Sequence, residues 1–175
     1  MLPEAAYSDL FALQYKGQRE FQVRFGRVDV LTIGHAVEVE AYGSWSEGAR
    51  QAMAYAHQVN RLCLTIRKSW DGPTPEPVEP AVAVYGSLAG SDVQHLFRRA
   101  GGVLALFVLR GTVWTHIRSN TDARRAARMG ADGDVSDAVR RMLIAKHVAA
   151  RKPSEAVMGT YSADVAAIMD RVFAE

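Results

Sequence analysis

Cysteine is nearly absent from this chain, and long hydrophobic runs are missing altogether. Its 175 residues include one cysteine, Cys63, which excludes an internal disulfide and a zinc cage built on thiolates. The longest apolar run, 103–109, is too short to cross a bilayer. The first ten residues lack the basic and apolar segments of a signal peptide. We therefore expect a cytoplasmic protein that does not span a membrane.

Charge is balanced overall but unevenly distributed. The net charge is +2 at pH 7. Residues 1–97 hold 8 Lys and Arg against 11 Asp and Glu, whereas residues 98–175 hold 13 against 8. An acidic half beside an arginine-rich half fits a metal site next to a surface that binds a polyanion. The alternative is that these charges lie on ordinary solvated helix faces.

The hydrophobic pattern predicts an α/β fold with a mixed sheet flanked by helices. We expect helices at 3–16, 44–69, 91–99, 121–129, 135–151 and 162–173, and strands at 21–25, 28–31, 36–40, 81–85, 103–109 and 112–118. Ser44 and Glu47 have the spacing of a capping box for the second helix. The alternation of hydrophobic residues at 62–66 would also permit a strand there. The proline-rich segment 71–80 is expected to be a loop.

The length suits a single domain over residues 1–175. Its core is expected at about 3–118 with an insertion at about 60–80, followed by a helical extension at 119–175. The strand–helix–strand pattern over 81–109 predicts two parallel strands joined by a crossover.

Three carboxylates lie on two neighbouring predicted strands. Glu38 and Glu40 are two residues apart and share one face of their strand. If Ile33 and Gly34 form a two-residue turn, Asp29 lies opposite Glu38. Like charges so close together repel unless a cation bridges them, and carboxylate oxygens are the ligands that Mg²⁺ and Mn²⁺ prefer. The alternative is a hairpin whose acidic face is in water.

The next predicted helix carries Gln51 and Tyr55, four residues apart on one face. The order of a helix with Glu4, a strand with Gly26-Arg27-Val28-Asp29, a strand with Glu38-Val39-Glu40 and a helix with Gln51-x-x-x-Tyr55 resembles the PD-(D/E)XK nuclease superfamily. Within it, the pattern is similar to the RecB-like branch with the Q-x-x-x-Y motif. The resemblance covers about residues 3–59 and extends less closely to 81–109.

This resemblance implies a restriction-endonuclease-like αβββαβ core and hydrolysis of DNA phosphodiester bonds with Mg²⁺ or Mn²⁺. The implied metal ligands are Glu4, Asp29, Glu38, Glu40 and the backbone carbonyl of Val39. Gln51 and Tyr55 would support the site and contact the nucleic-acid backbone. Glu40 departs from the family pattern, which usually has lysine there. A catalytically inactive protein that binds DNA or a protein partner is therefore the alternative.

Arginines supply the expected contacts to phosphate. The candidates are Arg27, Arg50, Arg118, Arg124, Arg125 and Arg128. For any one of Arg118, Arg124, Arg125 and Arg128, a solvated helix face or a surface ion pair is the more common role, whereas Arg27 and Arg50 lie closer to the motif and to the expected substrate. DNA is thus the expected partner, and a homodimer is left open.

Overall fold

The structure is a computed structural model that describes residues 3–67, 76–100 and 102–129. The chain divides into two compact units, Met1–Val135 and Ser136–Glu175. The helices expected at 135–151 and 162–173 lie outside the described residues. Within the described residues, no helix is long and apolar enough to cross a membrane.

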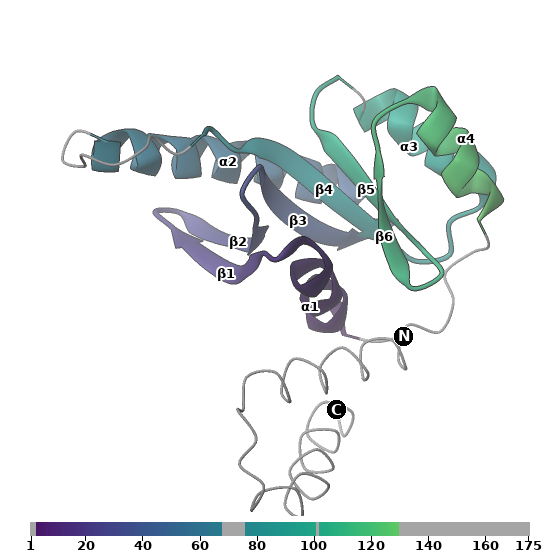
Figure 1. The fold of residues 1–175 in the computed structure, drawn as a ribbon, viewed down its shortest axis with the longest axis horizontal. Coiled ribbons are helices and arrows are strands. Elements are labelled where there is room, and N and C mark those ends of the chain that lie inside the picture. The colour runs from purple at the N-terminus through teal and green to yellow at the C-terminus, as the bar shows by residue number, and fades with distance from the viewer. Residues whose placement is uncertain (1–2, 68–75, 101, 130–175) are drawn as a thin grey trace, which may run out of the picture. The chain divides into compact units, whose positions relative to one another are not determined.

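The described residues of the first unit form an α/β fold in which four helices flank a six-stranded mixed sheet (Figure 1). The elements are α1 (Glu4–Tyr15), β1 (Gln18–Val23), β2 (Gly26–Leu31), β3 (His35–Ala41), α2 (Trp45–Arg67), β4 (Glu79–Tyr85), α3 (Gly90–Ala100), β5 (Ala105–Arg110), β6 (Val113–Ile117) and α4 (Asn120–Arg128). The strands lie side by side in chain order. β3, β4 and β5 are parallel, and the other neighbouring pairs are antiparallel. The predicted fold class and the parallel pair joined through α3 are confirmed.

Alternating side chains bury the two faces of the sheet against different helices. On one face, Tyr7 of α1 stacks on Tyr85 with ring centroids 3.8 Å apart, and Phe11 contacts Phe107 and Trp114. On the other face, one cluster joins β4 and β5 to α3 and α4, and another joins β2 and β3 to α2. Because side chains along a strand alternate between faces, β4 and β5 can be buried on both sides at once.

Several predicted boundaries are wrong, each for a local reason. β1 ends at Val23 because Arg24 and Phe25 form the turn into β2. β5 begins at Ala105, since residues 103 and 104 still belong to the turn after α3. The proline-rich loop is shorter than expected, because Pro80 lies in β4. It precedes Ala81, where the pairing with β5 begins, so its missing N–H is tolerated.

The long second helix is confirmed, but its predicted cap is not. α2 continues to Arg67, so residues 60–67 are helical and the strand that the alternation at 62–66 would permit does not form. Its Ser44 hydroxyl donates to the Ala41 carbonyl at 3.2 Å, and the Glu47 N–H bonds to the Ser44 backbone carbonyl. α4 packs on α3 within the first unit, which ends at Val135.

Candidate functional site

The acidic pair lies where β2 and β3 separate. Val30 pairs with Val37 and Leu31 with Ala36, so this register places Asp29 opposite Glu38. The predicted hairpin and register are confirmed. At Asp29, hydrogen bonds to side chains take the place of backbone–backbone hydrogen bonds between the strands. The Asp29 N–H donates to Glu38 Oε1 at 3.3 Å, and the Val39 N–H donates to Asp29 Oδ2 at 2.9 Å. Two carboxylates therefore occupy the space between the strands.

Burial makes this pair electrostatically unfavourable. Glu38 is 4% exposed, and burial, followed by the charge of Asp29, raises its pKa to about 8. Burial also raises the pKa of Asp29, against the lowering effects of the Val39 N–H and of Arg19 and Arg27. With so high a pKa, the Glu38 carboxyl keeps its proton at neutral pH unless a cation binds beside it.

Two further carboxylates approach the pair from β3 and α1. Glu40 is half-buried against Gly48 of α2, where a side chain on residue 48 would collide with it. Burial is the main cause that raises the pKa of Glu40, and the nearby Ser44 side chain lowers it. Glu4 is exposed as a whole, but neighbouring atoms partly shield its carboxyl from water. This loss of solvation, followed by the charges of Asp29 and Glu40, raises its pKa. The four predicted carboxylate ligands therefore lie within electrostatic range of one another.

The basic residues near this cluster offset its charge only in part: Arg19 lowers the pKa of Asp29 and of Glu4, and Arg27 lowers that of Asp29. Arg19 forms an ion pair with Asp9, and Arg27 lies 3.5 Å from Glu20. Both arginines thus also interact with other carboxylates, and neither lowers the pKa of Glu38. The four acidic residues keep an excess of negative charge, which a divalent cation would offset.

The carboxylates do not converge on a single point. Among the described residues, no group of three or more His, Cys, Asp or Glu side chains is arranged to hold a metal ion. One oxygen of Asp29 and one of Glu38 accept hydrogen bonds from backbone N–H groups. Metal binding would therefore require these side chains to rotate, or to use their remaining oxygens.

Tyr85, a residue that the sequence reading missed, borders the carboxylates. It ends β4, and the charges of Glu4, Glu40 and Asp29 act on its phenol. Burial is the largest cause that raises the pKa of Tyr85 to about 12, so the hydroxyl remains a donor at neutral pH. A tyrosine at the end of a buried strand was the available signal, but sequence alone does not show which strand adjoins β3.

Gln51 and Tyr55 lie on α2, both half-buried. A Cβ atom on Gly26 would lie 2.5 Å from the Tyr55 hydroxyl oxygen, and Gly26 has a φ of 136°. Only glycine adopts this conformation readily and admits so close an approach. Tyr55 thus supports the start of the strand that carries Asp29.

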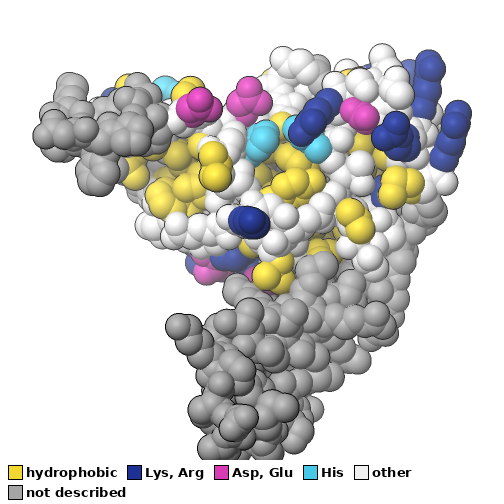
Figure 2. Space-filling model, in the orientation of Figure 1, with side chains coloured by type: hydrophobic (Ala, Val, Ile, Leu, Met, Phe, Trp, Pro, Cys, Tyr) yellow, Lys and Arg dark blue, Asp and Glu magenta, His cyan; other side chains and the backbone are white. Residues whose placement is uncertain are grey.

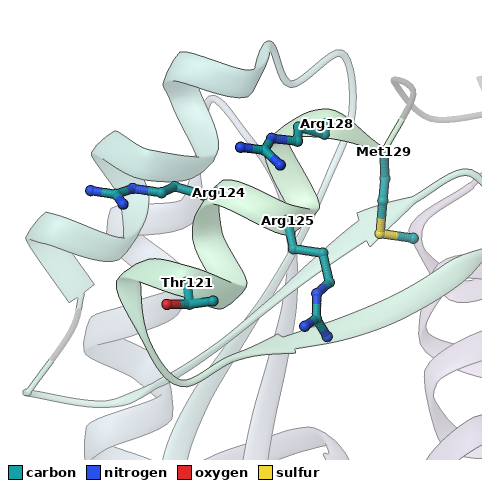
Figure 3. A pocket seen from close by; sticks show the side chains of 5 residues that line it. All are labelled: Thr121, Arg124, Arg125, Arg128 and Met129. Carbon is teal, nitrogen blue, oxygen red and sulfur yellow. The ribbon is translucent and has the colours of Figure 1, made fainter.

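The predicted phosphate-binding arginines are divided between different parts of the molecule. Three of them project from α4 and line a surface hollow of ≈ 490 Å³ with Thr121 and Met129: Arg124, Arg125 and Arg128 (Figure 3). Arg124 and Arg128 extend side by side, whereas Arg125 points another way (Figure 3). Lys and Arg side chains also gather over α3 and α4 in Figure 2.

The C-terminal end of α4 lies at the same edge of the sheet as the carboxylates. The buried guanidinium of Arg110, the last residue of β5, donates to the carbonyls of Leu88, Ala126 and Met129. These bonds hold the end of α4 beside the carboxyl ends of β4 and β5. Arg128 therefore lies on the edge where β3 and β4 end at Ala41 and Tyr85.

Arg118 lies at the opposite edge, and Arg27 and Arg50 are exposed on β2 and α2. Arg118 lines a second hollow with Glu79 and Ala105, the first residues of β4 and β5. Glu79 pairs with His35, five residues before Glu40, which corresponds to about 17 Å along the strand. At this distance, the Arg118 side chain cannot form a direct ion pair with Glu40.

The site combines four interacting carboxylates, a protonated tyrosine and a basic helix on the same edge of the sheet. Carboxylate oxygens are the ligands that divalent cations prefer, and arginines attract polyanions, but in the described residues no three acidic side chains are arranged to hold a metal ion. Comparison with protein-family models, with curated proteins and with solved structures finds no match to this chain.

Proposed function

We propose that this protein is a nuclease that hydrolyses DNA phosphodiester bonds with Mg²⁺ or Mn²⁺ and has a restriction-endonuclease-like αβββαβ core. The observation that carries the proposal is the opposition of half-buried Asp29 to buried Glu38 at the point where β2 and β3 separate. Burying two opposed carboxylates is costly. Folding alone does not require two carboxylates at this place. A function that uses their charge would explain why the chain bears the energetic cost of burying them.

The donor set fits a hard divalent cation. Asp29, Glu38 and Glu40, with Glu4 and the Val39 carbonyl, would supply the oxygens that Mg²⁺ and Mn²⁺ prefer. When bound, such an ion lowers the pKa of water and neutralises charge on the phosphate. Glu38 must release its proton to act as a ligand, so cation binding and deprotonation are coupled at this residue.

The remaining side chains serve to position substrate and to move protons. Glu40 is more exposed than Glu38, so one of its carboxylate oxygens could bind the ion while the other accepts a proton from the attacking water. Tyr85 keeps its proton and can donate a hydrogen bond to a phosphate oxygen. Arg128 and its neighbours on α4 would hold the DNA backbone through its phosphates.

A second candidate function is that of a nuclease-fold protein that binds DNA without cutting it. Two observations favour it: Glu40 stands where the family pattern has lysine, and no three acidic side chains are arranged for a metal in the described residues. Both functions use the same arginines, so binding alone does not distinguish them.

Cleavage assays separate the two candidates. Plasmid and linear DNA should be cut with Mg²⁺ or Mn²⁺ and left intact with EDTA. Asp29→Asn and Glu38→Gln should each abolish cutting, whereas Glu76→Gln, which alters an exposed carboxylate outside the cluster, should cut normally. If the wild-type protein binds DNA but never cuts it with either ion, the non-catalytic function replaces the nuclease.

A further inference from the structure

The turn between β1 and β2 presents a large aromatic side chain to solvent. Phe25 is 71% exposed. The turn is held in place: the Phe25 N–H donates to Gln58 Oε1 at 2.9 Å, and Gln22 Nε2 donates to the carbonyls of Val23 and Gly26. Tyr55, on the same helix as Gln58, packs against Gly26. The exposure of Phe25 is therefore a feature of an ordered turn, and most of its surface stays in solvent after folding.

Beside this turn lies a hollow of ≈ 710 Å³ between β1 and the outer side of α2. The described residues that line it are apolar, basic or neutral polar and include no Asp or Glu, the main contributors being Phe25, Leu62, Arg24, His57 and Arg61. The Arg24 guanidinium lies over the Phe25 ring, 4.9 Å from its centroid. Leu62 is among the exposed large hydrophobic residues. The hollow thus offers an aromatic ring and an apolar wall within a basic rim.

We propose that this hollow binds an unpaired segment of DNA, with Phe25 stacking on a base and with Arg24 and Arg61 contacting phosphates. The inference rests on the proposed function and specifies its substrate class. Aromatic rings beside basic side chains are the usual means of holding single strands, because every unpaired base exposes its flat face. In duplex DNA these faces are stacked inside the helix and are inaccessible to Phe25.

The position of the hollow suits such a substrate. Phe25 precedes β2, and Asp29 lies four residues further on, about 13 Å along the strand. A strand held at Phe25 can therefore continue to the carboxylates. The basic side chains of the lining, Arg24 and Arg61, favour a polyanion. The Phe25 ring beside them favours a nucleic acid over an acidic peptide, because unpaired bases offer flat faces on which it can stack.

Binding in EDTA tests this inference without requiring cleavage. Fluorescence anisotropy would compare a labelled oligo-dT strand with a duplex of equal length for the full chain and its variants. Phe25→Ala should weaken single-strand binding by about 5- to 150-fold, the loss expected for one base stack, and Phe25→Trp should restore it. Ile33→Ala is the matched control: Ile33 is 93% exposed in the β2–β3 turn and lines no part of the hollow.

The arginines provide a second, independent readout. Arg24→Gln and Arg61→Gln should each reduce the slope of log affinity against log salt by about 0.7 on the single strand. Equal affinity of Phe25→Ala and wild type for oligo-dT would overturn the inference, as would an equal loss on the duplex. So would a concentration-dependent dimer that Phe25→Ala abolishes, because the hollow would then bind a second copy of the chain.

Failure of the proposed function would be recognised separately. A wild-type protein that binds oligo-dT through Phe25 but never cuts DNA with Mn²⁺ would contradict the nuclease and retain the strand-binding hollow. If the wild-type protein cuts DNA but Phe25→Ala binds oligo-dT as tightly as wild type, the nuclease is retained and the strand-binding hollow is contradicted.

Discussion

Replacing Glu38 by glutamine should stabilise the protein in the absence of metal, and the gain should grow with pH. Burial and Asp29 raise the pKa of Glu38 from 4.5 to about 8 in the folded state. A raised folded pKa means that folding binds a proton. The stability that this proton contributes is fully present below pH 4.5 and is lost as the pH rises through about 8. Glutamine has no such dependence, and its amide oxygen can still accept from the Asp29 N–H.

The size of the effect follows from the interval between the two pKa values. One pH unit within the interval costs the wild-type protein about 1.4 kcal/mol relative to the variant. From pH 4.5 to 8 the difference approaches about 5 kcal/mol, which is an upper value because local relaxation and water reduce it. That is a large part of the typical stability of a domain, about 5–15 kcal/mol.

Urea unfolding of both proteins in EDTA, at several pH values from 5 to 9, measures this dependence. The difference in unfolding free energy between Glu38→Gln and wild type should increase steadily to about pH 8 and then level off. Glu76→Gln should show no such increase, because residue 76 is exposed and belongs to no helix or strand. A constant difference for Glu38→Gln across the whole range would refute the assignment of Glu38 as a buried, protonated carboxyl.

Three further predictions concern the site and its support. Glu40→Lys should keep detectable cleavage but need a higher metal concentration, and Mn²⁺ should support more activity than Mg²⁺. Glu40→Ala should lose nearly all activity. Titrations of activity against metal that are identical for Glu40→Ala and wild type would show that Glu40 has no role in cleavage. Replacing Arg124, Arg125 and Arg128 together by glutamine should flatten the salt dependence of duplex binding by about 2.7 in log–log slope, and an unchanged slope would place the DNA elsewhere. Gly26→Ala should destabilise the protein by about 1–3 kcal/mol through its φ of 136°, with a further cost from the collision with Tyr55. Urea unfolding measures that loss, and a change below about 0.5 kcal/mol would contradict the close packing.

The hairpin that carries the acidic pair could be predicted because its determinants are local. The length of the turn at Ile33 and Gly34 sets the register, and the two-residue period of a strand then decides which side chains are opposed. The long α2 helix was predictable for a similar reason, since its apolar residues recur at helical spacing. These features depend on residues close together in the chain.

Positions that depend on distant segments were not predictable in the same way. Arg118 was grouped with the α4 arginines by charge, yet β6 places it at the other edge of the sheet. Ser44 has the spacing of a cap, but its hydroxyl instead donates to the Ala41 carbonyl at the end of β3. Spacing identifies the donors and acceptors, and the surrounding packing selects the partner.

The sequence by itself determined the order of the elements and the opposition of Asp29 to Glu38. Only the tertiary structure decided how deeply Glu38 is buried and therefore how strongly its pKa is raised. It also brought Tyr85 to the carboxylates, because β4 pairs with β3 only after the chain has passed through α2. Register follows from short-range geometry, whereas burial and the field at a carboxylate are sums over segments that are remote in sequence.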